Sequence, residues 1–342
     1  MNYTEKGSKL YLFSIVLVAV IGGLLFGYDT AVISGAEKGL QAFFMGADFE
    51  YTDAIHGITS SSALIGCIIG SAVSGFFASG LGRKNSLFLA GILFFLSALG
   101  SYYPEFLFFE HGVPSYSLLV AFNFYRVLGG IGVGLASAIC PMYIAEIAPS
   151  NIRGTLVSWN QFAIIFGQLV VYFVNFLILG SHANPVIDLV NGVNQIMNPE
   201  AAAWTTETGW RLMFVSEAVP AGLFALLVLL VPETPRYLAM CGKDERALNV
   251  LSRINGASQA KVILAEIKAT TEEKDRKTLY LRLDGYLYRY HAERIPAGCR
   301  HQCRALFRSA HIRDDGHGQS DGTNRAHGRC QYPLYLAGCV HG

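Results

Sequence analysis

Six long apolar stretches constrain the fold of this chain more than any other feature. A helix needs roughly 20 apolar residues to cross the hydrocarbon core of a bilayer, which is about 30 Å thick. The 342 residues are 52% hydrophobic and only 15% charged, too apolar for an ordinary soluble domain. We therefore predict membrane-spanning helices over residues 10–34, 54–77, 85–102, 117–145, 154–179 and 210–231.

Glycines are dense within these stretches, for example at Gly66 and Gly70 and at Gly129, Gly130 and Gly134. So many glycines would weaken a soluble helix. In a membrane, small residues let helix backbones approach closely where no hydrophobic force drives association. The pattern favours a tightly packed helical bundle.

Lysine and arginine are distributed unevenly among the connections between the predicted spans. The segments 101–117 and 181–208 contain none, and the first outer loop contains only Lys38. The positive-inside rule therefore places residues 1–9 and the segment after the sixth span on the cytoplasmic side. The basic residues on that side are Lys6, Lys9, Arg83, Lys84, Arg153, Arg236, Lys243, Arg246 and Arg253. The net charge of +1 argues against a nucleic-acid partner.

The chain divides by composition after the spans. Residues 10–236 form the predicted bundle, and residues 237–280 are polar and helix-prone, with Glu273 and Lys277 at i, i+4 spacing. We expect cytoplasmic connector helices there, although a solvated helical tail would have the same pattern.

Two ionisable residues lie deep in apolar stretches, Asp29 in the first and Arg126 in the fourth. A charge in hydrocarbon is costly unless it is paired or neutralised, and intramembrane acids usually belong to ion or proton pathways. We expect Asp29 to pair with Arg126 and to carry a proton. A purely structural ion pair is the alternative.

Three amides recur every seven residues in the fifth stretch, at Gln161, Gln168 and Asn175, and so share one helical face. A polar stripe in a membrane helix faces the bundle or a wet cavity, where amides can exchange hydrogen bonds with hydroxyl groups. Hydrogen bonding between helices is the alternative, most of all for Asn175.

Several motifs in order resemble one transporter family. They are G-G-L-L-F-G-Y-D-T-A-V-I-S-G at 22–35, G-R-K at 82–84, P-M-Y-I-A-E-I-A-P-S-N-I-R-G at 141–154 and P-E-T-P-R at 232–236. Together they look like the sugar porter family of the major facilitator superfamily, over residues 10–277. S-A-L-I-G-C-I-I-G at 62–70 and N-Q-F-A-I-I-F-G-Q at 160–168 look like the bacterial D-xylose/proton symporters. One departure is Ser79-Gly80, where many members have Asp-Arg.

The resemblance implies an all-α major facilitator fold. We expect its N-terminal six-helix bundle of 3+3 repeats and the connector helices here, with the C-terminal six-helix bundle missing. It implies a monomeric multi-pass protein of the bacterial inner membrane that is not an enzyme and needs no cofactor or metal besides a coupling proton. The expected activity is D-xylose/proton symport by alternating access. The alternatives are facilitative or proton-coupled transport of glucose, galactose or arabinose, a sugar sensor, and an inactive fragment.

The resemblance also assigns roles to individual residues. Gln161 and Gln168 would bind the sugar, Phe26 would form a wall of the sugar site, and Asp29 with Arg126 would couple the proton. A cytoplasmic gate of salt bridges would contain Arg83, Glu146, Arg153, Glu217, Glu233 and Arg236.

Residues 281–342 differ abruptly from the rest. Lysine vanishes, and the segment holds nine arginines, six of the nine histidines and four of the seven cysteines. Cys299, His301 and Cys303 do not have the usual spacing of metal ligands. A one-base shift of codons for residues 294–308 can read F-Q-Q-x-V-G-I-N-x-V-L-Y, the sugar-binding pattern of the family's seventh span. We therefore interpret the tail as translated out of frame.

Overall fold

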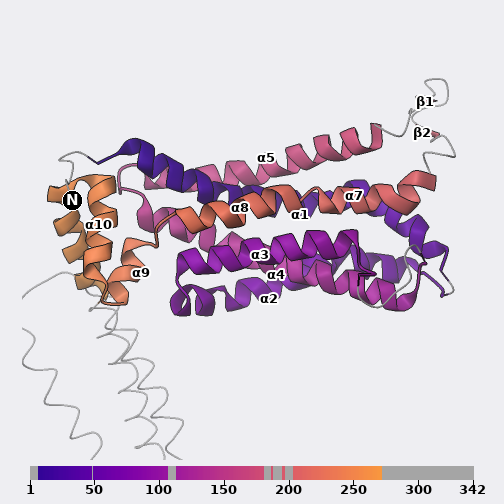
Figure 1. Ribbon diagram of the computed structural model, residues 1–342, viewed down its shortest axis with the longest axis horizontal. Coiled ribbons are helices and arrows are strands. Elements are labelled where there is room, and N and C mark those ends of the chain that lie inside the picture. The colour runs from indigo at the N-terminus through magenta and orange to yellow at the C-terminus, as the bar shows by residue number, and fades with distance from the viewer. Residues whose placement is uncertain are drawn as a thin grey trace, which may run out of the picture. The chain divides into compact units, whose positions relative to one another are not determined.

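A computed structural model of the chain describes residues 7–47, 49–106, 113–180, 186–187, 195–196 and 203–271. The out-of-frame interpretation of residues 281–342 and the Cys299, His301 and Cys303 cluster lie outside the described residues. The described part is helical, apart from one pair of short strands (Figure 1).

Six helical stretches are long and apolar enough to cross a membrane, which confirms the six predicted spans. The first five are α1 (Lys9–Met45), α2 (Asp53–Gly80), α3 (Arg83–Tyr102), α4 (Tyr116–Ile147) and α5 (Arg153–Gly180). The sixth consists of a π-helical turn η1 (Thr205–Gly209), α7 (Trp210–Val215) and α8 (Ala218–Leu230). The chain continues with α9 (Pro235–Met240), α10 (Asp244–Asn255) and helical residues 257–271.

Two elements differ from the prediction. α1 was expected to end at Ser34 but continues to Met45, because Phe43 and Phe44 are buried and Phe43 packs 5.5 Å from the Trp210 ring of α7. In the connection between α5 and span six, β1 (Val186–Ile187) pairs antiparallel with β2 (Gln195–Ile196). No strand was expected there.

Side chains that accept hydrogen bonds from first-turn N–H groups define where several helices begin. Such caps satisfy donors that have no partner within the helix. Ser8 accepts from the Tyr11 N–H, and corresponding bonds begin α2, α4 and α9, at Thr52, Ser115 and Thr234. In α9, Pro235 occupies the first helical turn, where its missing N–H costs nothing.

A break at Ser216 and Glu217 divides span six into α7 and α8. Pro220 has no N–H to donate to the carbonyl of Ser216, four residues earlier, so the helical ladder is interrupted at that point. The break lies in the middle of the span and presents Glu217 to the bundle interior, where the residue is 1% exposed.

Glycines line the two closest helix pairs. A Cβ on Gly66 of α2 would overlap the Val127 carbonyl, and one on Gly130 of α4 would overlap the Ala63 carbonyl. Gly27 of α1 and Gly167 of α5 lie equally tightly against backbone of the partner helix. The predicted close packing through glycine is therefore confirmed for α2 with α4 and for α1 with α5.

The packing pattern agrees with two repeats of three spans. α1 packs on α5 as α4 packs on α2, and α3 packs on α4 as span six packs on α1. If spans one, two and three are replaced by spans four, five and six, and the reverse, the same pairs result.

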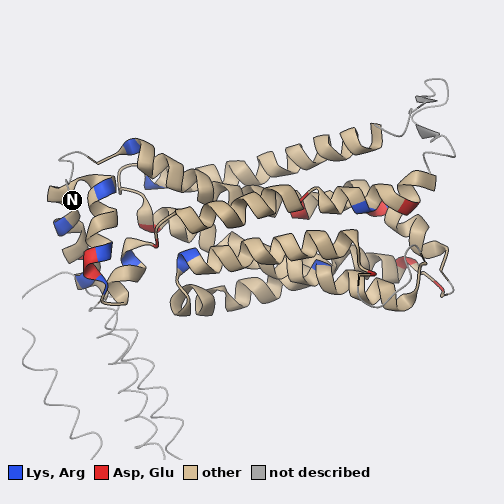
Figure 2. Ribbon diagram, in the orientation of Figure 1, with Lys and Arg blue, Asp and Glu red and all other residues tan. Residues whose placement is uncertain are grey.

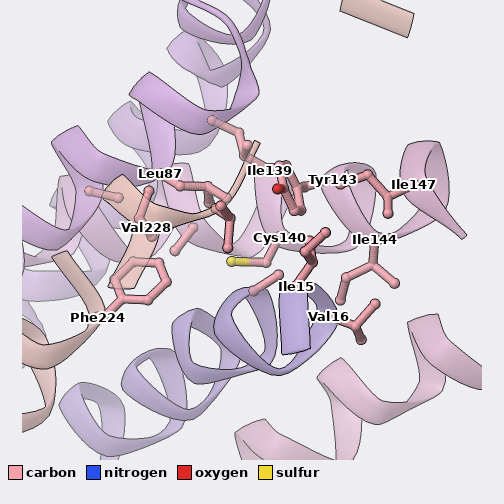
Figure 3. Close-up of a cluster of buried hydrophobic side chains, with 14 of the residues drawn as sticks. Ile15, Val16, Leu87, Ile139, Cys140, Tyr143, Ile144, Ile147, Phe224 and Val228 are labelled. Atoms are coloured by element: carbon pink, nitrogen blue, oxygen red, sulfur yellow. The ribbon is translucent and has the colours of Figure 1, made fainter. Parts of the chain in front are cut away.

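Apolar side chains from α1, α3, α4 and α8 fill the bundle toward the end at which α1 begins. Figure 3 shows Ile15, Leu87, Tyr143 and Phe224 within this cluster, around the buried Cys140. Lysine and arginine gather at the same end, beside α9 and α10, and few charged residues lie in the middle of the spans (Figure 2). We call this end, where α1, α3 and α5 begin, the basic end, and the other the outer end.

Candidate functional site: a buried ionic cluster and an amide face

Asp29 of α1 and Arg126 of α4 are in contact in the interior of the bundle, as the sequence predicted. Arg126 Nη1 donates to Asp29 Oδ1 at 2.5 Å, and the two residues are 2% and 1% exposed. The guanidinium also lies over the Phe214 ring of α7, 5.0 Å from its centroid. A charge-assisted bond of this kind reduces the cost of holding both ions away from water.

Glu217 joins this pair, which corrects the expectation that it lies in the cytoplasmic gate. Its carboxyl group is within hydrogen-bonding reach of Asp29 and in the field of Arg126. Glu217 Oε1 is buried without a hydrogen-bond partner among the described residues. The motif placed Glu217 in the gate because the order of residues does not show how deep a residue lies in the bundle. The break before Pro220 directs this carboxylate into the middle of the bundle.

The cluster of Asp29, Arg126 and Glu217 therefore holds two carboxyl groups and one fixed positive charge. With both carboxylates ionised it carries a net charge of −1, and with one proton it is neutral. Two carboxyl groups can hydrogen-bond to each other only when one is protonated. A low-dielectric interior penalises net charge, so the arrangement is suited to taking up one proton.

Hydroxyl groups adjoin the cluster on the side of span six. The Tyr28 hydroxyl, next to Asp29 in α1, lies 2.7 Å from Ser216 Oγ. Ser216 Oγ also donates to the Met213 carbonyl at 2.5 Å. These bonds join α1 to the break between α7 and α8 at the level of the acids.

The three amides of α5 have different surroundings, although they share a heptad spacing. Gln161 is exposed, Gln168 is half-buried, and Asn175 is 4% exposed. Asn175 Nδ2 donates to the Val32 carbonyl of α1 at 3.4 Å, so this residue joins two helices. The decrease in exposure from Gln161 to Asn175 follows from the small rotation that a helix of 3.6 residues per turn accumulates over each heptad. Phe26 is half-buried in α1 and packs against the apolar cluster of Figure 3.

At the basic end, the structure brings together three of the expected gate residues. Arg83 Nη2 donates to Glu146 Oε1 at 2.8 Å, and its guanidinium lies 5.3 Å from the centre of the Tyr237 ring. The Glu233 carboxylate accepts the backbone N–H groups of Arg83 and Lys84, at 3.1 and 3.2 Å. Glu233 thus caps the start of α3, where Gly82 has a φ of +93° and supplies no side chain.

The remaining gate residues are placed differently. Arg153 donates to the Ala148 carbonyl at 3.4 Å, and Arg236 is exposed. Neither forms an ion pair with a carboxylate among the described residues. Lys84 was not among the expected gate residues, yet its Nζ donates to the Leu229 carbonyl of α8 at 2.7 Å.

A second buried ion pair, at the outer end, was also missed. Arg211 of α7 contacts both carboxylate oxygens of Glu105, which follows α3, at 2.8 and 2.5 Å. Its guanidinium lies over the Trp210 and Phe43 rings, at 4.6 and 5.2 Å. The available signal was a single arginine at the start of the sixth apolar stretch with one acid near the end of the third.

No metal centre is formed by the described residues, in which no three His, Cys, Asp or Glu side chains gather closely enough to hold an ion. The described cysteines, Cys67, Cys140 and Cys241, are free.

Comparison with known proteins agrees with this architecture. Residues 15–293 match the model of a family described as "Sugar (and other) transporter". The D-xylose-proton symporter of Escherichia coli K12 is 46% identical over 277 residues, covering 78% of this chain and 52% of that protein. The arabinose-proton symporter of Bacillus subtilis is 36% identical over 265 residues, covering 78% and 50%. All are named as transporters, which agrees with the expectation that the chain is not an enzyme.

Solved structures give the same match. The xylose transporter XylE from E. coli in a partially occluded inward-open conformation superposes with a TM-score of 0.68 at 46% identity, over 77% of this chain and 60% of that one. The proton:xylose symporter XylE of the major facilitator superfamily, bound to 6-bromo-6-deoxy-D-glucose, gives 0.70 at 44% identity, over 81% and 56%. The chain spans about half the length of the curated relatives it matches. It belongs to the sugar transporter family of the major facilitator superfamily.

Proposed function

We propose that this chain forms the N-terminal six-span half of a proton-coupled sugar transporter whose substrate is D-xylose. The single observation that carries the proposal is the buried cluster of Asp29, Arg126 and Glu217 in the middle of the spans. A structural ion pair needs one carboxylate for one arginine. The second carboxylate creates a site for an exchangeable proton.

The amide face of α5 supplies the sugar ligands in this proposal. Gln161 is exposed and Gln168 half-buried, whereas Asn175 is already bonded to α1. Exposed amides at the depth of a membrane are stable only where they face a wet cavity or a neighbouring domain. Gln161 and Gln168 would therefore donate to and accept from sugar hydroxyl groups, with Phe26 as a nearby apolar wall.

The contacts at the basic end close the cytoplasmic side. Arg83 with Glu146, and Glu233 at the start of α3, would form and break as the two halves of the transporter rock about the central site. The N-terminus and α10 would lie in the cytoplasm of a bacterial cell, with the bundle in its inner membrane. The positive charge at that end supports this orientation. We expect a monomer.

Asp29→Asn tests the proton-coupling role. The chain is reconstituted in liposomes alone, and together with the part of the E. coli D-xylose-proton symporter that it does not cover. We expect proton-driven accumulation of labelled D-xylose by the pair to be lost in Asp29→Asn, while exchange of labelled for unlabelled D-xylose without a gradient persists. Asp53→Asn, an exposed acid at the start of α2, serves as control. Unchanged accumulation in Asp29→Asn would contradict coupling through this acid.

The same experiment separates the alternatives. Accumulation of glucose, galactose or arabinose in preference to D-xylose would change the substrate but keep the mechanism. Exchange without accumulation in the unaltered protein would indicate a facilitator. Sugar binding by the chain without transport by the pair would favour a sensor, and no binding in either form would indicate an inactive fragment.

A further inference from the structure

A stripe of polar side chains follows one face of α3 from the middle of the bundle to its outer end. Ser97 and Ser101 are four residues apart, and Glu105 follows four residues later, just beyond the helix. They are 1%, 0% and 3% exposed. Residues at i and i+4 lie one above the other on a helix, so the two serines form a continuous buried line.

Within the described part of the chain, the two hydroxyl groups on this line lack hydrogen bonds, as does that of Ser60 in α2. Ser97 Oγ and Ser101 Oγ are buried with no hydrogen-bond partner among the described residues. Ser86, on the same helix and also 0% exposed, instead donates to the Gly82 carbonyl at 2.7 Å. Because buried hydroxyl groups normally bond to protein or to ordered water, two unpaired ones in a row indicate a role that requires free donors and acceptors.

The inner end of the line reaches the ionic cluster. Ser97 packs against Gly129 of α4, where a Cβ would overlap Ser97 Oγ and would lie 3.9 Å from Asp29 Oδ1. The serine hydroxyl and the aspartate carboxylate thus flank the same glycine, and Gly129 lies one turn from Arg126. In this arrangement we expect water to bridge the hydroxyl group and the carboxylate.

The outer end of the line reaches the Arg211–Glu105 pair. Arg211 Nη1 donates to the Tyr102 carbonyl, the residue after Ser101, at 3.1 Å. Arg211 Nε is buried without a partner among the described residues, so a free donor continues the line at this end. Glu105 neutralises the arginine, so this ion pair carries no net charge that would repel a proton.

We propose that Ser97 and Ser101 form a proton path along α3, from the outer end of the bundle to the Asp29–Arg126–Glu217 cluster. The proposal rests on the proton site of the proposed function. Each hydroxyl oxygen accepts a proton from one neighbour and releases its own proton to the next, so one proton moves and neither serine is changed. Water completes the relay, because residues at i and i+4 are about 5–6 Å apart at Cβ.

This path is separate from the amide face. α3 packs on α4, α7 and α8, whereas α5 packs mainly on α1. A proton that follows α3 therefore reaches the cluster without passing Gln161 or Gln168, and a bound sugar does not obstruct it.

The test measures proton exchange at the cluster in the purified full chain, reconstituted in lipid. Infrared spectroscopy follows the C=O stretch of the protonated carboxyl group after transfer to D₂O, with the band assigned by its loss in Asp29→Asn or Glu217→Gln. We expect Ser97→Ala and Ser101→Ala each to slow deuteration of this band about tenfold, the kinetic equivalent of one lost hydrogen-bonded link. Ser97→Cys keeps a weaker donor of similar size, so its rate of deuteration should lie between those of the wild type and Ser97→Ala.

Ser86→Ala is the matched control, because that hydroxyl is equally buried on α3 but already bonded. Deuteration of the double variant Ser97→Ala/Ser101→Ala at the rate of Ser86→Ala would overturn the proton path. So would the absence of any protonated carboxyl band at pH 5, since the path would then have no destination. The measurement needs no sugar transport. If the chain failed to carry D-xylose but Ser97→Ala and Ser101→Ala still slowed deuteration, the proposed substrate would be rejected and the proton path would stand.

Discussion

Arg126 decides whether the middle of this bundle can hold two acids. It contacts Asp29 directly, lies beside Glu217, and is almost fully buried. Removal of one partner from a buried ionic group leaves uncompensated charge, which is more damaging than loss of the whole group. The stability of the fold is therefore coupled to the same residues that we propose bind the proton.

Arg126→Leu should lower the free energy of unfolding by about 3–5 kcal/mol at pH 7, because it leaves Asp29 and Glu217 without a counter-charge. The loss should shrink in acid, where both carboxyl groups take up protons. Unfolding of the purified protein in detergent, followed by circular dichroism, measures both effects. Arg236→Leu, which removes an exposed arginine, should change stability by less than about 0.5 kcal/mol. Equal losses in the two variants would show that the cluster does not depend on Arg126.

Helix α4 makes its closest approach to α2 through glycines. Gly66 and Gly70 on one helix face Gly130 and Gly134 on the other, and each lacks the space for a Cβ because backbone atoms of the partner occupy it. Packing between helices in lipid depends on such close contact, since burial of apolar surface provides no driving force there. The pair of helices therefore cannot tolerate even one added methyl group without moving apart.

Gly130→Ala should lower the free energy of unfolding by about 1–3 kcal/mol, because the new methyl group meets the Ala63 carbonyl. Gly75→Ala is the matched control within α2, where a Cβ would meet nothing within 4 Å. That change should be neutral or stabilise the helix by up to about 1 kcal/mol. Chemical denaturation of both variants in the same detergent provides the comparison, and similar effects of the two would argue against the tight α2–α4 crossing.

The short helices α9 and α10 hold several spans together at the basic end. The Ser8 N–H donates to the Arg253 carbonyl of α10 at 2.9 Å, and the Tyr237 hydroxyl of α9 donates to the Gly80 carbonyl of α2 at 3.0 Å. Glu233, just before α9, caps α3. The ends of three spans are thus held by one short segment, so a change of charge at Glu233 affects the whole basic end.

Burial raises the pKa of Glu233 above its ordinary value of 4.5, although N–H groups of Thr234, Lys84 and Arg83 partly oppose the rise. The folded protein therefore holds this proton more tightly than the unfolded chain does. The resulting stability is fully present below pH 4.5 and is lost as the pH rises through the folded-state pKa. We expect melting temperatures of the wild type to fall relative to Glu233→Gln over that range. Glu207→Gln, at an exposed acid of η1, should show no such divergence, and parallel curves for Glu233→Gln would refute the raised pKa.

The six spans, the need for glycine at close helix contacts and the pairing of Asp29 with Arg126 could all be predicted from the order of residues alone. Each depends on one-dimensional information: the length of an apolar run, the density of small residues, and an isolated charge that hydrocarbon does not tolerate alone. The family resemblance followed from the same segments, since its motifs lie at their ends and within them.

The positions of the remaining polar groups required the folded structure, because the depth of a residue in the bundle and the rotation of its helix set its neighbours. Because the helix breaks before Pro220, Glu217 lies in the ionic cluster and not in the expected gate. Because a 3.6-residue helix rotates slightly over each heptad, Asn175 faces α1 whereas Gln161 is exposed. The lack of hydrogen bonds at Ser97 and Ser101 could not be predicted from the sequence, because a serine in an apolar run usually donates to a carbonyl of its own helix. Their burial depends on α4 and α7, which pack against α3.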